Sequence, residues 1–85
     1  MDIITKKLMK VFSRMRVSRN FLRTETRYIK DLGFDSIDIL DFVAKLELEF
    51  HINIKDEDIK RFDTVGSTLR YLKGQIETSH NYAIA

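Results

Sequence analysis

The sequence predicts an all-α fold: a four-helix bundle with three longer helices, one short helix and a long loop between the first and second helices. Apolar residues recur every three or four positions in three segments. The chain contains no proline, and no segment shows the alternation of a half-buried strand. With 85 residues it forms one domain at most, and it buries about 60–65% of the surface that its unfolded chain exposes. The core must therefore be simple.

The first helix is expected over residues 2–16. Its buried face consists of apolar residues at helical spacing: Ile4, Leu8, Val11, Phe12 and Met15. Residues 17–35 lose this periodicity and end near Gly33, which predicts a long loop held by a few apolar anchors. An unstructured connection of this length is uncommon in a compact domain and is usually functional where it occurs. The loop is therefore a clue to function.

The second helix is expected to begin at Asp35 and Ser36 and to end near Phe50. Asp35 followed by Asp38 suits the unpaired amides and the positive end of a helix dipole. A core stripe is formed by Ile39, Phe42, Val43, Leu46 and Phe50. A second apolar stripe is formed by Ile37, Leu40 and Ala44, with Asp38, Asp41 and Glu47 around it. The second stripe is either a contact surface with an acidic rim or a set of residues covered by the preceding loop.

Two further helices complete the bundle. The acidic run at residues 56–58 opens a short helix that reaches about Arg61. Thr64 precedes a last helix whose buried face consists of Val65, Leu69, Leu72 and Ile76. The domain is expected to span residues 1–77, and residues 78–85 are expected to form a flexible tail.

Several classes of function are disfavoured. The chain has no cysteine, which excludes disulfides and a thiol nucleophile of its own. Ser36 and His51 are separated by fifteen positions on one predicted helix, about 22 Å, which excludes a serine–histidine pair. His51 and His80 have no metal-ligand spacing, and the acids at 56–58 lack the pattern of a calcium loop. We therefore expect neither an enzyme nor a metal site.

The charge is divided along the chain. Residues 1–30 carry nine Lys and Arg against two acids, whereas residues 31–85 carry six against eleven, so the net charges are +7 and −5. The charged residues within the apolar N-terminal run argue against a signal peptide or a membrane span, and a cytoplasmic protein without membrane insertion is expected. The basic half favours either a solvated face that neutralises the acidic half or a surface that binds an anionic partner. Few aromatic residues are interleaved with it, so no nucleic acid is expected.

Ser36 is the remaining candidate for chemistry, since it lies directly after the long loop in the first turn of a helix. A phosphodiester attached there would lie near free backbone amides, whose dipoles stabilise an anion by about 0.3–1 kcal/mol at an exposed site. The alternative is an ordinary helix-capping serine.

The segment around Ser36 resembles the acyl carrier protein family. Residues 31–38, DLGFDSID, are similar to the family's DLGxDS(L/I)D signature, and LELEF at 46–50 is similar to its LExEF sequence. The similarity continues through IKDED at 54–58 to the last helix and covers about residues 3–77. The resemblance implies a four-helix bundle with a long first loop. It also implies that Ser36 carries 4'-phosphopantetheine, whose thiol holds an acyl group as a thioester.

The resemblance also implies a monomer, together with partners and contact residues. A phosphopantetheinyl transferase would install the arm from coenzyme A, and acyl-transferring and condensing enzymes such as ketosynthases would use it. The positions that correspond to partner-binding residues of the family are Asp35, Ile37, Asp38, Leu40, Asp41 and Glu47. An acyl chain folded back into the bundle would be lined by Leu46, Phe50 and Ile54.

The sequence departs from the acidic character of the family through its basic first half, Lys45, Leu48 and the pair Lys60 and Arg61. These departures favour a carrier for a specialised pathway over the general fatty-acid pathway, because charge complementarity selects partners. Fatty-acid, polyketide and related specialised lipid biosynthesis all remain open. Two alternatives are a stand-alone aminoacyl or peptidyl carrier and an unmodified interaction module that binds an anionic surface through its basic first helix.

Overall fold

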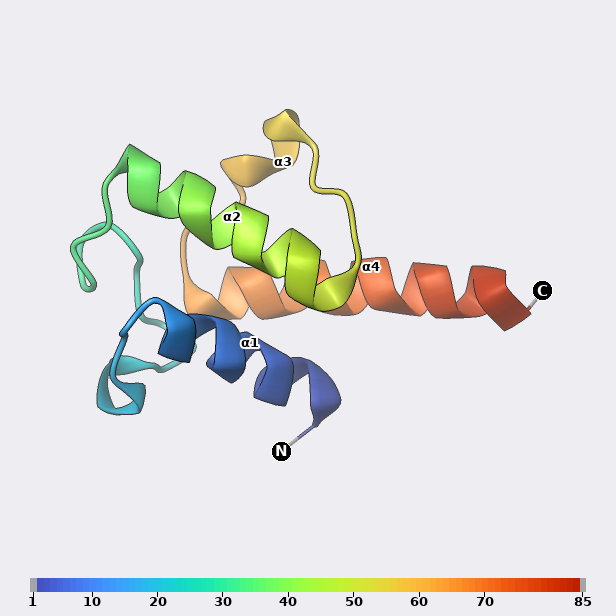
Figure 1. Cartoon of the computed structure of the whole chain (residues 1–85), viewed down its shortest axis with the longest axis horizontal. Coiled ribbons are helices and arrows are strands. Elements are labelled where there is room, and N and C mark those ends of the chain that lie inside the picture. Colours follow the sequence, from blue (N-terminus) through green and yellow to red (C-terminus); the bar gives the residue numbers. More distant parts are fainter. Residues whose placement is uncertain (1, 85) are drawn as a thin grey trace.

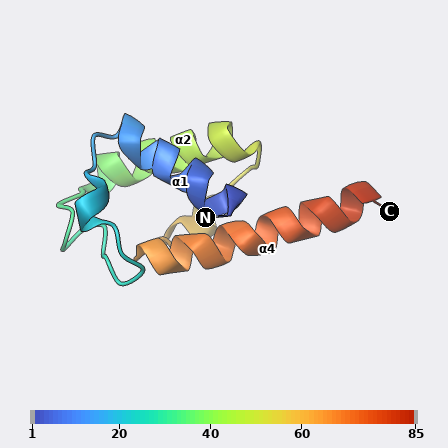
Figure 2. The same ribbon diagram turned by 90° about the horizontal axis from the view of Figure 1, so that it is seen from below.

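The computed structural model describes the backbone of residues 2–84 and the side chains of residues 2–76. Three longer helices, α1 (Ile3–Arg14), α2 (Ser36–Phe50) and α4 (Val65–Ile84), pack around one core with the short helix α3 (Asp56–Ile59). Figure 1 shows α3 at the end of the connection that leaves α2, and the view in Figure 2 shows α1 and α2 on one side of α4. The predicted all-α four-helix bundle is therefore confirmed.

The helix ends follow from local hydrogen bonds. The Asp2 side chain accepts a hydrogen bond from the Thr5 amide at 2.7 Å and caps α1. This contact, together with the charge of a nearby lysine, holds the pKa of the Asp2 carboxyl below its usual value. Beyond α1, Arg16 adopts a left-handed conformation with φ 61°, and the amide of Val17 donates to the carbonyl of Phe12 at 3.0 Å. This arrangement closes the helix in the way that glycine usually does.

The core is rich in aromatic rings. The predicted faces of α1 and α2 supply Leu8, Phe12, Phe42 and Leu46, each with a side chain fully removed from solvent. The rings of Phe12 and Phe42 stack with centroids 5.1 Å apart. The ring of Tyr28, from the long loop, lies 4.9 Å from that of Phe42, so this loop contributes to the core.

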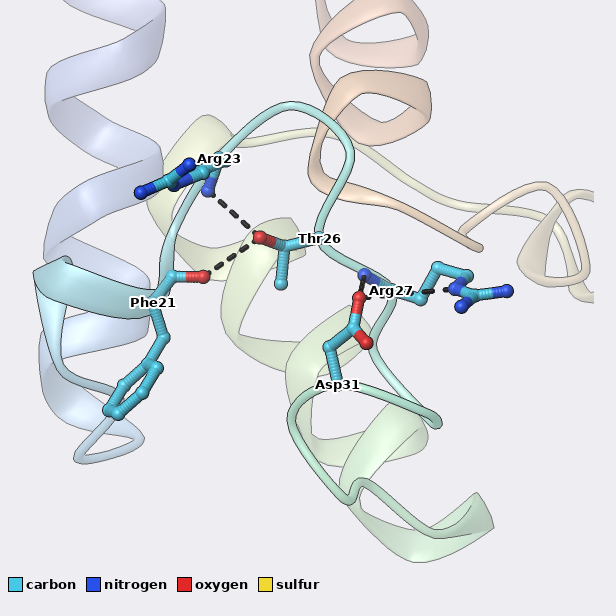
Figure 3. Close-up of polar contacts among 5 residues, drawn as sticks. All are labelled: Phe21, Arg23, Thr26, Arg27 and Asp31. Carbon is cyan, nitrogen blue, oxygen red and sulfur yellow. Dashed lines mark hydrogen bonds and ion pairs between the residues drawn. The ribbon is translucent and has the colours of Figure 1, made fainter.

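The connection between α1 and α2 is ordered by hydrogen bonds, and it contains a 3₁₀ helix, η1 (Arg19–Phe21), that the sequence pattern did not predict. The buried hydroxyl of Thr26 donates to the Phe21 carbonyl at 2.8 Å and accepts from the Arg23 amide at 2.9 Å (Figure 3). The Asp31 carboxylate accepts from the Arg27 amide at 2.8 Å. These local bonds fold the segment into two successive turns.

Contacts with the start of α4 fix the same connection from the other side. The Tyr28 amide donates to the Asp63 carbonyl at 3.1 Å, and the Val65 amide donates to the Thr26 carbonyl at 3.0 Å. The loop therefore lies beside the α3–α4 turn, as two perpendicular views show (Figures 1 and 2). The predicted long loop is present, and it is tied to the rest of the fold.

The boundaries after α2 differ slightly from those predicted. α3 ends at Ile59 instead of about Arg61, and the backbone of α4 is helical through Ile84. The side chains of the expected tail, residues 78–85, lie outside the described residues, and its flexibility stays a prediction. Within the described part of the chain, no helix is both long enough and apolar enough to cross a bilayer.

Candidate functional site at the start of α2

Ser36 is the first residue of α2, and its side chain is exposed. The helix cap is formed by Asp35, whose side chain accepts from the Asp38 amide at 2.9 Å, while the Asp38 side chain accepts from the Asp35 amide at 3.0 Å. This reciprocal capping box leaves no capping role for Ser36. Among the described residues, the Ser36 hydroxyl has no hydrogen-bond partner, so the hydroxyl is displayed to solvent on a fixed helical turn.

The segment before Ser36 fixes where α2 begins. Gly33 adopts a left-handed conformation with φ 73°, which residues with a Cβ rarely adopt. The next residue, Phe34, is buried, and its ring lies 5.8 Å from that of Tyr28. The Phe34 amide donates to the Tyr28 carbonyl at 3.0 Å. Ser36 therefore stands two residues beyond an anchor in the core, so its position is set by the core.

A groove of about 510 Å³ opens at Ser36 and separates α2 from the segment containing α3. Its lining is mostly apolar: Ile29, Ser36, Ile39, Leu40, Ile59, Lys60, Phe62 and Asp63. The three residues that the resemblance suggested for an acyl chain folded into the bundle, Leu46, Phe50 and Ile54, are buried in the core, and they do not line this groove. Their contact with an acyl chain stays a prediction. The groove was missed because α3 approaches α2 only through the tertiary fold.

The carboxylates expected around the second stripe all have partners within the chain. Asp38 belongs to the capping box, and Asp41 accepts two hydrogen bonds from the Lys45 ammonium, at 2.7 and 2.8 Å. The Glu47 carboxylate accepts from the amide of Ile54 at 2.8 Å and so holds the connection between α2 and α3. These three residues therefore contribute to the fold, whatever else they contact.

The apolar residues of the second stripe are exposed. Ile37 is 74% exposed, Leu40 is 57% exposed, and Ala44 is also exposed. The preceding loop does not cover them, which leaves the contact-surface interpretation. Leu48, which stood out in the sequence only as a departure from the family pattern, continues the stripe and is 77% exposed.

The basic face of α1 is partly engaged by α2. The Glu49 carboxylate accepts from the Arg14 guanidinium at 3.1 Å and lies 3.8 Å from the Lys10 ammonium. Lys7 lies over the Phe50 ring, 5.8 Å from its centroid. Much of this basic face therefore neutralises and covers the end of α2, as the solvated-face interpretation expected.

The histidines take no part in a metal site within the described residues. His51 ends α2 with a left-handed backbone, φ 55°, and its amide donates to the Glu47 carbonyl. The side chain of His80 lies outside the described residues. No group of three metal-ligating side chains occurs in the part of the chain whose side chains are described.

Comparison with known proteins shows which family the chain resembles. The profile of the family "Phosphopantetheine attachment site" matches residues 17–72. The chain is 35% identical over 63 residues to the acyl carrier protein of Wolinella succinogenes, covering 74% of this chain and 83% of the relative. It is 34% identical over 62 residues to the acyl carrier protein of Chlorobium phaeobacteroides, covering 73% and 80%.

A solved structure agrees with the sequence comparisons. The solution structure of a candidate acyl carrier protein from Anaplasma phagocytophilum superimposes with a TM-score of 0.72 at 27% identity, covering 87% of this chain and 88% of that one. The matched profile includes Ser36, the capping box and the groove residues. Family members are carriers and not catalysts, in agreement with the prediction from the sequence. The chain belongs to the acyl carrier protein family and contains that family's phosphopantetheine attachment domain.

Proposed function

We propose that the protein carries acyl groups on a 4'-phosphopantetheine arm attached to the hydroxyl of Ser36. The observation that carries this assignment is the exposed Ser36 hydroxyl, without a partner among the described residues, at the mouth of an apolar groove. When bound, the arm supplies a terminal thiol that holds the acyl group as a thioester, which a chain without cysteine does not supply itself.

The residues around Ser36 fit such a group. Two amides of the first turn are already occupied, since those of Asp38 and Ile39 are bonded to Asp35, at 2.9 Å through its side chain and 3.1 Å through its carbonyl. The amides of Ser36 and Ile37 have no partner among the described residues and are the ones that an anion can meet. The positive end of the α2 dipole lies at Ser36 and favours a phosphodiester there. The exposed hydroxyl leaves room for the bulk of the arm. Charge and access therefore both suit a phosphodiester on this side chain.

The groove supports an alkyl acyl cargo. Its apolar residues Ile39, Ile59 and Phe62 offer a hydrocarbon chain contacts that a polar amino acid would not use. This chemistry favours fatty-acid, polyketide or related specialised lipid biosynthesis over an aminoacyl or peptidyl pathway. The partners would then be a phosphopantetheinyl transferase and acyl-transferring or condensing enzymes such as ketosynthases.

Intact-mass measurement tests the assignment. The protein is incubated with coenzyme A, Mg²⁺ and a broad-specificity phosphopantetheinyl transferase, and is then weighed beside the variants Ser36→Ala and Ser13→Ala. Ser13 is an exposed serine on α1 and serves as the matched control. We expect one phosphopantetheinyl group on the wild type and on Ser13→Ala, and none on Ser36→Ala. An unmodified wild type, or a modified Ser36→Ala variant, would contradict the proposal.

A further inference from the structure

We infer that a basic loop surface, the η1 surface, formed by Arg16, Arg19, Phe21 and Arg23, holds the protein against an anionic membrane without crossing it. The inference goes beyond the proposed function and does not depend on it, since none of these four residues lines the groove at Ser36. It moves the anionic contact that the sequence suggested for the first helix to the loop that follows that helix.

Unpaired positive charge lies on the loop, whereas the cations of α1 that face α2 are occupied. Lys10 and Arg14 share the Glu49 carboxylate, at 3.8 and 3.1 Å. By contrast, the exposed side chains of Arg16 and Arg19 have no hydrogen-bond or ion-pair partner among the described residues. Residues 16–30 carry five Arg and Lys against one acid, so their net charge is +4. The loop therefore carries positive charge that its own neighbours do not neutralise.

The one acid of this segment is already engaged. The Glu25 carboxylate accepts a hydrogen bond from the Thr24 hydroxyl, and this bond is the main reason why the pKa of Glu25 lies below its usual value. The charge of Arg23 makes a smaller contribution to the same shift, and Arg23 forms no ion pair among the described residues. Arg23 therefore keeps its charge available to a partner.

A hollow of about 510 Å³ marks the edge of the η1 surface. Arg16 and Phe21 lie on one side of it, and the side toward α2 carries three carboxylates, those of Asp31, Asp38 and Asp41. Each carboxylate has a contact inside the molecule, with the Arg27 amide, the Asp35 amide and the Lys45 ammonium respectively. An anionic layer is therefore attracted to the η1 side of the hollow and repelled by the other side, so docking leaves the start of α2 uncovered.

Arg16 occupies a backbone conformation that favours glycine. Its φ is 61°, in the left-handed region, where a residue with a Cβ is disfavoured. This conformation closes α1, and glycine would close the helix with less strain. Strained backbone commonly marks functional positions, and here the side chain concerned is an exposed, unpaired cation. An arginine at this position thus points to a use for its charge outside the fold.

Phe21 supplies an apolar anchor among these cations. It is 66% exposed although its backbone is fixed, because its carbonyl accepts from the Thr26 hydroxyl and its amide donates to the Ser18 carbonyl. Figure 3 shows the Phe21 ring directed away from Thr26. An exposed ring with arginines on either side of it in the sequence suits the interface of a bilayer, where the ring enters the headgroup layer and the cations contact lipid phosphates.

Two other classes of anionic partner fit this surface less well. Binding of single-stranded nucleic acid uses several aromatic rings on which bases stack, and the η1 surface has one ring. A specific protein interface has an apolar core that is depleted in charge, whereas here the ring stands among three arginines. A lipid surface requires neither feature, because each cation near an anionic bilayer adds attraction on its own.

Co-sedimentation with vesicles tests the inference. The unmodified protein is mixed with vesicles of phosphatidylcholine alone, or with about 30% phosphatidylglycerol, at roughly 50 and 400 mM NaCl. The tested variants are Phe21→Ser and the triple variant Arg16→Gln, Arg19→Gln and Arg23→Gln.

Each variant has a matched control. Ile3→Ser is the control for Phe21→Ser, because Ile3 is 65% exposed but lies on α1. The control for the arginine variant is the triple variant Lys55→Gln, Lys60→Gln and Arg70→Gln, which removes the same charge from exposed positions beside α3 and on α4.

We expect the wild type to bind the anionic vesicles, more weakly as salt rises, and not to bind phosphatidylcholine alone. Each arginine should change the partition coefficient about fivefold, so the triple arginine variant should lose about a hundredfold. Phe21→Ser should lose about fivefold, and Ile3→Ser should match the wild type. The triple control variant should lose less than about tenfold, since it lowers only the net charge.

The inference is overturned if the wild type does not bind anionic vesicles, if it binds both kinds of vesicle equally, or if the two triple variants bind alike. Tighter binding to single-stranded RNA than to anionic vesicles in the same buffer would also overturn it and assign the η1 surface to nucleic acid. Ser36→Ala should bind vesicles as the wild type does, which separates these outcomes from the modification of Ser36. Circular dichroism of each variant confirms that the helices are retained.

Discussion

The hydroxyl oxygens of Tyr28 and Thr68 lie 2.6 Å apart in the core and join the long loop to α4. Thr68 also donates to the Thr64 carbonyl at 3.1 Å, so Tyr28 is the donor in the shared hydrogen bond. The Tyr28 ring contacts Phe12, Phe34 and Phe42. A single side chain thus fixes the loop that ends at Ser36 to three helices.

Removing either partner of the Tyr28–Thr68 hydrogen bond should lower the free energy of unfolding, but by different amounts. Tyr28→Phe removes the donor but leaves Thr68 bonded to Thr64, so the free energy of unfolding should fall by about 1 kcal/mol. Thr68→Val leaves a buried phenol without a partner and should cost about 1–3 kcal/mol. The double variant should cost less than the sum of the two. Urea unfolding of all four proteins measures this coupling, and strict additivity would contradict it.

Stability should fall at alkaline pH because of Tyr28. Burial raises the pKa of the Tyr28 phenol above its usual value, and the hydrogen bond with Thr68 only partly offsets this. The folded state therefore retains a proton that the unfolded state loses above a pH of about 10. The contribution of Tyr28 is fully present below that pH and is lost as the pH rises toward the folded pKa, by up to about 1.4 kcal/mol per pH unit. The free energy of unfolding, measured with urea, should therefore fall less steeply for Tyr28→Phe than for the wild type between roughly pH 10 and 11.5. Equal slopes for the two proteins would refute this.

The capping box at Ser36 should contribute measurably to stability. Asp35→Ala removes the acceptor of the Asp38 amide and should lower the free energy of unfolding by about 1 kcal/mol. Asp35→Ser restores an acceptor and should recover most of the loss. Denaturant midpoints of the three proteins test this, and an Asp35→Ala variant as stable as the wild type would mean that the cap has no net effect.

Substitutions at the two residues with a left-handed backbone, Gly33 and Arg16, should change the stability of the protein in opposite directions. Gly33→Ala should cost about 1 kcal/mol from the backbone alone, because a Cβ at this position meets no atom within 4 Å. Arg16→Gly relieves the same conformational strain after α1 and should stabilise the protein by about 0.5–1 kcal/mol. Thermal unfolding distinguishes the two. A destabilised Arg16→Gly would show that the arginine side chain contributes more than its backbone costs.

Local patterns were sufficient to predict the helices and most of the core. The spacing of Leu8, Phe12, Phe42 and Leu46 places them on buried faces, and the structure confirms them there. The Asp35 and Asp38 cap was also predictable, because both partners lie within one turn. The position at which α2 begins, next to Ser36, could therefore be predicted from neighbouring residues alone.

The remaining features depend on contacts between distant residues. The groove beside Ser36 exists because Ile59 and Phe62 approach α2. Tyr28 is buried because its ring packs against rings from both α1 and α2. The role of Glu47 as acceptor for the Ile54 amide requires the chain reversal after α2. The Asp41–Lys45 ion pair, in contrast, could have been predicted from the sequence, because oppositely charged residues four positions apart on a helix lie close together.

Peptide fragmentation of the modified protein tests most directly whether the hydroxyl of Ser36 carries the arm. After treatment with coenzyme A and the transferase, we predict one phosphopantetheinyl group, located on Ser36 and on no other serine. A group located on any other residue, or a protein that stays unmodified, would contradict the claim.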